Sequence, residues 1–154
     1  MVIGFVLAVL WDVWKIARDR RGELRRAVRA IAQEISLNRD ALTENASLLD
    51  SDDAAAANNA EIVRPLNYLT TAAGDVAFSK GSLESRSIEL ATELARVYAN
   101  SDRLNRRTEA REAYRITNGA MSNYATRRKL INAELRPLIS SHLQELASFL
   151  EALK

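Results

Sequence analysis

A heptad pattern of apolar residues runs through the first third of the chain and restricts the fold more than any other feature. From position 3 to position 49, residues recur at alternating steps of four and three, and eleven of these fourteen positions are apolar. The eleven are Ile3, Leu7, Leu10, Trp14, Ala17, Leu24, Val28, Ile31, Ile35, Leu42 and Leu49. A pattern of this period and length is typical of one helix packed in a left-handed bundle or coiled coil. We therefore predict a single long N-terminal helix.

Three polar residues, Arg21, Asn38 and Asn45, interrupt this pattern. A leucine would be more stable at such a position, whereas a buried asparagine can set the register and the number of helices at some cost in stability. We therefore interpret Asn38 and Asn45, together with Asp12 in the apolar segment, as a candidate polar seam between subunits. The alternative is that both asparagines face solvent near the end of the helix.

The first seventeen residues have the composition of a membrane anchor. A helix over residues 1–14 is about 21 Å long and one over residues 1–17 about 26 Å, against about 30 Å for the hydrocarbon core of a bilayer. Trp11 and Trp14 stand where an interfacial aromatic belt is expected, and Lys15 and Arg18 can extend their charges outward. We therefore predict an anchor over 1–17, with these four residues at the membrane interface.

Basic residues follow the apolar run, and only the α-amine precedes it. The positive-inside rule then predicts a single-pass protein with its N-terminus outside and the rest of the chain in the cytoplasm. A cleaved signal peptide has the opposite order, with its positive charges first. The alternative interpretation is a helix buried in a soluble bundle, because an apolar run of roughly 10 to 14 residues is ambiguous.

The remaining sequence predicts more helices and no strands. Only five glycines and two prolines interrupt the chain, and β-branched residues rarely alternate with polar ones. We expect one domain over 18–154 with helices at about 18–49, 60–80, 83–117 and 121–153. We also expect a loop over 50–59, because its acidic and small residues cannot bury much surface. The fold class is therefore all-α: a long N-terminal helix that begins as a membrane anchor and continues into an elongated antiparallel bundle of about four helices.

The residues for common catalytic and metal chemistry are scarce. The chain has no cysteine and one histidine, His142. That histidine precedes Glu145 and so does not form the Glu-x-x-His pair of a carboxylate di-metal bundle. Ser140 and Ser141 adjoin it, but neighbouring residues on a helix point apart. No phosphate-binding glycine loop is present. We predict no catalytic, cofactor-binding or metal-ligating residue, and therefore no enzyme.

A second basic cluster comprises Arg103, Arg106, Arg107 and Arg111. It is a candidate docking site for an acidic partner or a phosphate. The alternative is a solvated tip of the bundle, because acidic residues stand among these arginines at pairing distance on a helix. The formal net charge is only +2 and aromatic residues are few in this region, which disfavours nucleic acid as a partner. The arginines after the apolar run instead suit anionic lipid.

One stretch, from Leu69 to Asn105, resembles small bacterial membrane-anchored helical proteins of unknown function. The matching residues are Phe78, Ser79, Lys80, Gly81, Leu83, Leu90, Leu94, Tyr98, Leu104 and Asn105. Those proteins have a hydrophobic N-terminal helix followed by a long basic helix, and they often carry a tryptophan where this chain has Gly74. The resemblance implies the same architecture and no particular activity.

These features together predict a membrane-anchored helical interaction or scaffold protein without catalytic activity of its own. Its partners would be the lipid membrane, further copies of the same chain and a second protein. One alternative is a small membrane effector or pore whose N-terminal helices assemble around Asp12 and Gly4. The other is a soluble oligomeric bundle in which the N-terminal helices bury one another.

Overall fold

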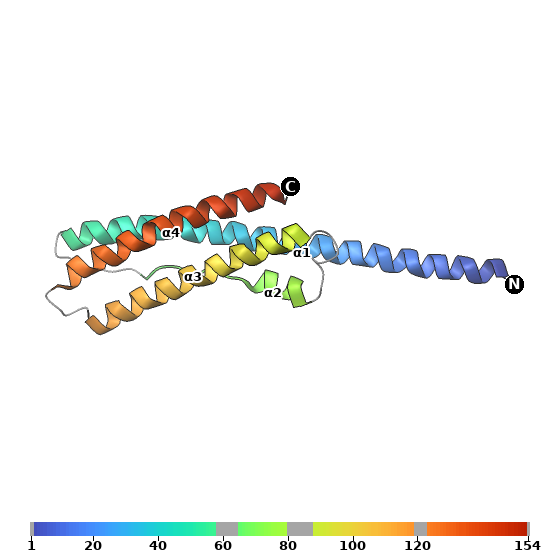
Figure 1. Cartoon of the computed structure of the whole chain (residues 1–154), viewed down its shortest axis with the longest axis horizontal. Helices are drawn as coiled ribbons and strands as arrows, with labels where there is room; N and C mark the ends of the chain where they lie inside the picture. Colours follow the sequence, from blue (N-terminus) through green and yellow to red (C-terminus); the bar gives the residue numbers. More distant parts are fainter. Residues whose placement is uncertain (1, 58–64, 80–87, 119–122, 154) are drawn as a thin grey trace.

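The computed structural model describes residues 2–57, 65–79, 88–118 and 123–153. It contains four helices: α1 (Val2–Ala57), α2 (Ala72–Ser79), α3 (Ile88–Asn118) and α4 (Tyr124–Ala152). Helix α4 packs along both α1 and α3 and runs antiparallel to them, while α2 packs against α1 (Figure 1). The prediction of an all-α bundle is confirmed.

The heptad pattern of α1 marks its buried face. Ile31, Ile35, Leu42 and Leu49 are almost completely buried, and Leu24 packs against them at the edge of the core. The other helices contribute their own stripes, which are Leu94, Val97 and Leu104 from α3 and Leu135, Ile139, Leu146 and Phe149 from α4. Spacing of four and three residues keeps each stripe on one side of its helix, so the three stripes meet in one core.

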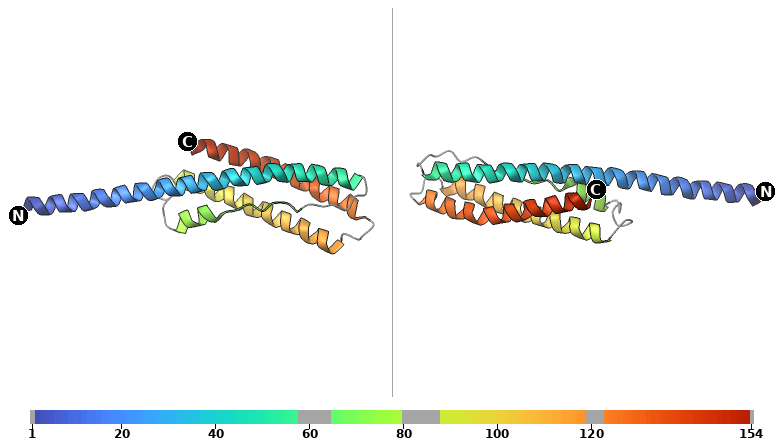
Figure 2. Two further views of the ribbon diagram at one scale, coloured as in Figure 1. Left: turned by 180° about the vertical axis from the view of Figure 1, so that it is seen from behind. Right: turned by 90° about the horizontal axis from the view of Figure 1, so that it is seen from above.

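The first part of α1 extends away from the bundle. Leu24 is the first residue of α1 in contact with the core among the residues whose side chains are described. The helix before it, residues 2–23, is roughly 33 Å long at 1.5 Å per residue. Both views in Figure 2 show this part continuing the axis of α1 beyond the other helices. One unbroken helix therefore joins the apolar start of the chain to the bundle.

Two of the predicted boundaries on α1 and α2 are wrong. The stretch predicted as a loop, 50–59, is helical through Ala57, because Asp52 is buried against arginines of α3 and α4. Of the predicted helix over 60–80, residues 72–79 are helical and residues 65–71 are not, while residues 60–64 and 80 lie outside the described part. Helices α3 and α4 differ from their predicted bounds of 83–117 and 121–153 by a few residues, and residues 83–87 and 121–122 lie outside the described part.

Three asparagines explain how residues 65–71, of which Leu66 and Leu69 are buried, pack against the bundle without forming a helix. Asn45 donates its amide to the Asn67 carbonyl at 2.9 Å and accepts the Asn67 N–H at 2.7 Å. Asn38 does the same for Thr70, and Asn105 of α3 does the same for Leu69. These side chains supply the hydrogen bonds that a neighbouring strand would supply. The segment therefore lies between α1 and α3 as an extended element beside the helices.

Helix α2 is fastened to the same face by a buried glutamate. Glu34 of α1 accepts the Ala73 N–H at 2.9 Å, in the first turn of α2, and the Tyr98 hydroxyl at 2.7 Å. Burial and this hydrogen bond raise the pKa of Tyr98 above its ordinary value, so the hydroxyl remains a donor. Gly74 lies against the Tyr98 ring so closely that a Cβ atom there would be 1.6 Å from Cε2. A side chain at position 74 is therefore excluded by this packing.

Candidate functional site

A cluster of buried charges closes the bundle at the end far from the N-terminus. The Asp52 carboxylate of α1 accepts a hydrogen bond from Arg111 of α3 at 3.0 Å and lies 3.4 Å from Nε of Arg128 of α4. Arg128 also donates to the Asp52 backbone carbonyl at 3.1 Å. All three side chains are at most 4% exposed. One carboxylate thus holds the ends of three helices together.

Further polar groups join this cluster, in which Asp52 Oδ1 and Arg128 Nε have no hydrogen-bond partner among the described residues. Asn132 is fully buried; its amide donates to Asp52 at 2.8 Å, and its oxygen accepts from Arg111 at 3.0 Å. Glu112 accepts one hydrogen bond from Arg111 and one from Arg115. Buried ions are tolerated when they are paired and hydrogen-bonded in this way. The cluster therefore determines how the helix ends fit together.

The position of this cluster follows from the heptad spacing. Asp52 is three residues beyond Leu49, and Arg111 is three residues beyond Thr108, so each continues the buried stripe of its helix. Arg128 and Asn132 continue the stripe of α4 in the same register. The sequence feature that indicates a buried cluster is therefore the presence of opposite charges on the buried stripes of α1, α3 and α4 at the same end of the bundle. Arg111 is consequently unavailable as an exposed docking charge, because it neutralises Asp52 and Glu112.

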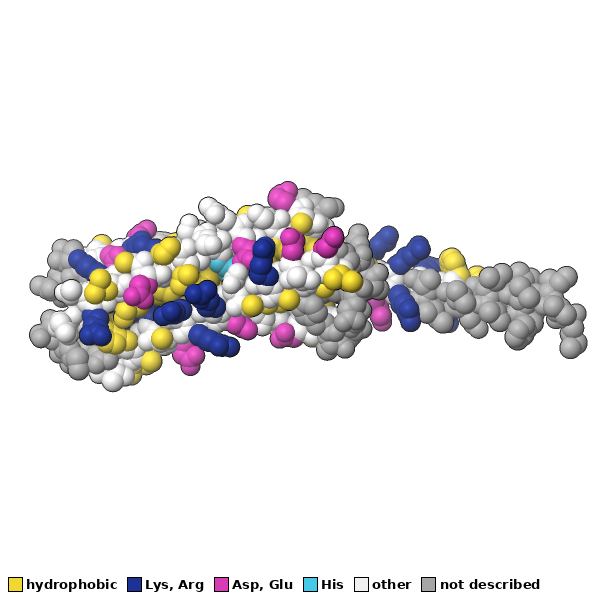
Figure 3. All heavy atoms as spheres, in the orientation of Figure 1, with side chains coloured by type: hydrophobic (Ala, Val, Ile, Leu, Met, Phe, Trp, Pro, Cys, Tyr) yellow, Lys and Arg dark blue, Asp and Glu magenta, His cyan; other side chains and the backbone are white. Residues whose placement is uncertain are grey.

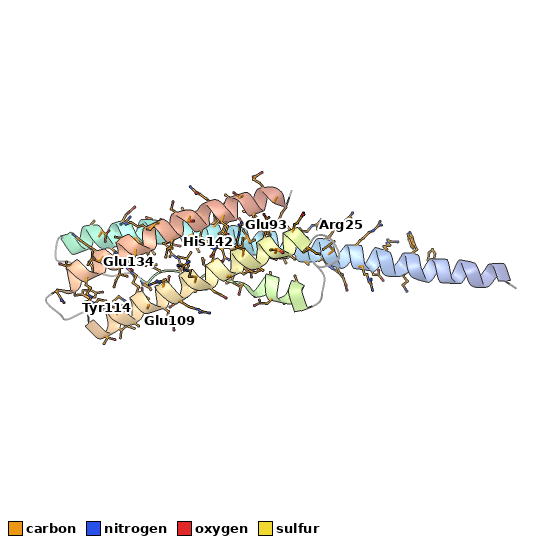
Figure 4. All side chains as sticks on the ribbon, in the orientation of Figure 1. Arg25, Glu93, Glu109, Tyr114, Glu134 and His142 are labelled. Atoms are coloured by element: carbon orange, nitrogen blue, oxygen red, sulfur yellow. The ribbon has the colours of Figure 1, made fainter. Side chains whose placement is uncertain are left out.

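The other predicted docking arginines separate into two groups. Arg103 and Arg107 line a groove of about 720 Å³ between α3 and α4, whereas Arg106 is exposed and does not line it. Figure 3 shows hydrophobic side chains on this face, with Lys and Arg side chains among them. Tyr114 on α3 and Glu134 on α4 also border the groove (Figure 4). Two of the four predicted docking arginines therefore line a groove.

The predicted polar-seam residues have different surroundings. Asn38 and Asn45 lie on the buried stripe of α1, and each binds the backbone of the extended segment in its own chain. Neither asparagine is exposed to solvent. Their hydrogen bonds within one subunit leave them no part in a seam between subunits. The Asp12 side chain lies outside the described residues.

The predicted membrane-interface residues lie on the projecting part of α1. Trp11 and Trp14 are 63% and 51% exposed, and their ring centroids are 5.2 Å apart. The Arg18 guanidinium lies 5.3 Å from the Trp14 ring centroid, within the range of a cation–π contact, and Lys15 is exposed beside them. Trp14, Arg18, Arg21 and Arg25 share one side of the helix. This side therefore combines aromatic surface with guanidinium groups.

No stretch of the described helices is both long enough and apolar enough to cross a membrane. The window that begins at Val2 reaches Asp12, Lys15 and Arg18 within eighteen residues.

Ser101, His142 and Glu145 form a hydrogen-bonded chain that was not expected from the sequence, which placed only Ser140 and Ser141 beside the histidine. Ser101 Oγ lies 2.9 Å from His142 Nε2, and His142 Nδ1 lies 2.8 Å from the Glu145 carboxylate (His142 is labelled in Figure 4). Burial lowers the pKa of His142, although the bond to Glu145 opposes this shift.

The order of these groups is that of a nucleophile, a base and an orienting carboxylate. Ser101 is completely buried, however, and its single hydroxyl proton can instead be donated to the Val97 carbonyl at 3.2 Å. A small cavity of about 110 Å³ nearby is lined by His142 and Glu145 but not by Ser101. In this arrangement the hydrogen bonds among Ser101, His142 and Glu145 join α3 to α4, and the Ser101 hydroxyl is not exposed to solvent.

Among the described residues, no group of three His, Cys, Asp or Glu side chains could hold a metal ion. Comparison of the sequence with protein-family models, with curated proteins and with solved structures finds no match.

Proposed function

We propose that this chain is a membrane-attached helical interaction protein without catalytic activity of its own. In this proposal the start of α1 embeds in the bilayer and the bundle is displayed on the cytoplasmic side, where it binds other proteins. The observation that carries the proposal is the projection of α1 beyond the bundle, with an apolar sequence first, then two exposed tryptophans, then a row of arginines.

The chemistry of this projecting part suits the boundary between lipid and water. Indole rings favour the headgroup region because one edge is polar and the rest apolar. Arg18, Arg21 and Arg25 follow Trp14 on the same side of the helix, where they can bind lipid phosphates. The apolar sequence before Trp11 supplies the hydrophobic part of the attachment, and the arginines supply an electrostatic part that salt should weaken.

The heptad positions on the projecting part of α1 also support self-association. The heptad pattern of α1 continues outward from Leu24 through Arg21 to Trp14, where the bundle does not cover it. A second copy of α1 can pack against this uncovered stripe in the geometry of a coiled coil. We therefore include a homo-oligomer, paired through the projecting helices, in the proposal.

The two tryptophans provide a direct test, because they are the only ones in the chain and both lie in the projecting part. Vesicles of mixed neutral and anionic phospholipid should shift the tryptophan emission to shorter wavelength, and the protein should float with the vesicles in a density gradient. Val6→Glu/Leu10→Glu should abolish both effects, because charged side chains are costly in hydrocarbon. Leu37→Glu, which adds one carboxylate at an exposed position of α1 within the bundle, should retain them.

Two further measurements separate the alternatives. Protease digestion of an N-terminal tag on vesicle-bound protein shows whether the helix crosses the bilayer or lies along it. Sedimentation without lipid or detergent shows whether the chains bury their projecting helices in one another. A discrete soluble oligomer with emission already at short wavelength, and unchanged by vesicles, would contradict membrane attachment.

A further inference from the structure

The groove between α3 and α4 exists because the two helices carry different kinds of side chain where they face each other. On α4 its surface is apolar, formed by Leu130, Ile131 and Leu138 around Glu134. On α3 the opposing positions are Arg103, Arg107 and Ala110, which follow one another by four and three residues and so share one side of the helix. From Arg103 to Ala110, the α3 lining has no large apolar residue to cover α4. Leu130 is consequently 61% exposed.

Three arginines stand on the rim of this groove. Arg103 and Arg107 are on the α3 side and Arg127 is on the α4 side, and all three are exposed. Within the described part of the chain none of them forms an ion pair, in contrast to Arg111 at the base, which Asp52 and Glu112 neutralise. Glu134 is the carboxylate among the lining residues. The groove therefore presents an apolar surface within an excess of positive charge.

The groove has the dimensions of a helix-binding site. Its lining runs from Arg103 to Tyr114 on α3 and from Arg127 to Leu138 on α4. Eleven steps of 1.5 Å correspond to about 16 Å, or roughly three helical turns. Both walls are helices whose backbone groups are already paired, so an added strand would find no partner there. An amphipathic helix, by contrast, binds such a groove through apolar side chains spaced by three, four and seven residues.

We infer that this groove docks an acidic amphipathic helix of a partner protein. Its apolar side would cover Leu130, Ile131 and Leu138, and its carboxylates would pair with the three rim arginines. Arginine forms such pairs well because its planar fork matches a carboxylate. The projecting part of α1 from another copy is the wrong occupant, because its own arginines would meet those of the rim. The inference depends on the interaction role proposed above and not on membrane attachment.

The test uses the full chain and a fluorescent peptide of about 18 residues (five helical turns), with leucines on one face and glutamates along both edges. Two control peptides have the same length: one carries lysine in place of glutamate, and one has the same composition in scrambled order. Binding is measured by fluorescence anisotropy without vesicles, so that a failure of membrane attachment leaves this measurement intact. The acidic peptide should bind at least about tenfold more tightly than either control.

Variants of the chain locate the binding. Arg103→Gln/Arg107→Gln should weaken binding of the acidic peptide about tenfold, because it removes two of the three rim charges. Arg106→Gln is the control for the loss of one charge, since Arg106 is an exposed arginine on the same helix outside the groove, and it should leave binding nearly unchanged. Leu130→Glu should abolish binding, whereas Leu37→Glu changes an equally exposed leucine of α1 and should not affect it.

Several results would overturn the inference. These are equal binding of the acidic and scrambled peptides, equal weakening by Arg106→Gln and by the double groove variant, or full binding by Leu130→Glu. Binding of an anionic single-chain lipid at the groove without binding of the acidic peptide would also overturn it and would assign the groove to lipid.

Discussion

Asn38 holds both backbone groups of Thr70. Its amide nitrogen donates to the Thr70 carbonyl at 2.7 Å, and its oxygen accepts the Thr70 N–H at 2.9 Å. Asn45 and Asn105 repeat this arrangement at Asn67 and Leu69. An extended segment can therefore be packed between helices without the unpaired backbone groups that would otherwise prevent its burial.

Asn38→Leu should destabilise the protein, although leucine is the better residue for a heptad position. The substitution removes the two hydrogen bonds to the Thr70 backbone and the 3.4 Å one from the Thr70 hydroxyl. It leaves the N–H and C=O of Thr70 without these partners, at a cost of about 2 kcal/mol. Urea denaturation measures this as a lower midpoint. The exposed control Gln33→Leu, on the same helix, should change stability by less than about 0.5 kcal/mol. An Asn38→Leu variant more stable than the original chain would contradict the role assigned to this asparagine.

Asp52→Asn should be far more damaging than Asp50→Asn. The first removes the charge that neutralises Arg111 and Arg128 in the interior, and breaking a buried pair costs about 3–5 kcal/mol. Asp50 pairs with Arg136 at the surface, with its own side chain 69% exposed, so its loss should cost less than about 1 kcal/mol. The free energies of unfolding of the two variants are compared in urea. Similar losses for both would show that the buried cluster does not hold the helix ends.

Gly74→Ala should destabilise the packing of α2 against α3. The new Cβ atom would lie 1.6 Å from Cε2 of Tyr98, so the ring or α2 must move, at a cost of about 1–3 kcal/mol. Tyr98→Leu/Gly74→Ala should lose less than the sum of the two single changes, because the ring is the obstacle. Gly22→Ala is the control, since nothing lies within 4 Å of its added Cβ atom and alanine favours the helix. Thermal unfolding of all four variants tests this, and an unchanged Gly74→Ala midpoint would refute the close contact.

Stability should fall as the pH is lowered through the ordinary histidine pKa of 6.5. Burial lowers the pKa of His142, so between 6.5 and its folded value the unfolded chain binds a proton there that the folded chain does not. The stabilisation is therefore complete above about pH 6.5 and lost progressively below it. The charged groups around the ring are Glu145, which binds it, and Arg96, which pairs with Glu145 at 3.0 Å.

His142→Gln isolates this contribution. Free energies of unfolding are measured in urea from pH 7.5 down to about 5, and the variant should lose the part of the slope that belongs to the histidine. Its stability at high pH is expected to be lower, because the hydrogen bonds to Ser101 and Glu145 change, but the slope is a separate quantity. Equal slopes for the two proteins would show that His142 does not titrate in this way.

Much of the fold could be predicted from spacing alone. The apolar stripe of α1 from Leu24 to Leu49 lies in the core where a period of four and three residues places it, as do Leu94 and Leu104 of α3 and Leu135 and Leu146 of α4. The same spacing places Asp52, Arg111 and Arg128 on the buried stripes, but charged side chains are ordinarily expected to be exposed to solvent. Only the meeting of opposite charges from three helices makes their burial favourable, and this requires the helices to be placed relative to one another.

The sequence by itself determined that the chain is helical, which faces of its helices are buried, and that an apolar segment with two tryptophans begins the first helix. These properties depend on local spacing and composition, so they can be recognised without knowing which residues lie nearby in the folded chain. The tertiary structure decided what the buried polar residues do. Asn38 and Asn45 bind a segment that had been predicted as helix, Ser101 meets His142, and Arg103 and Arg107 border a groove while Arg111 does not face solvent. Hydrogen bonds and ion pairs between distant residues depend on the position of both groups, and only the packed helices provide that position.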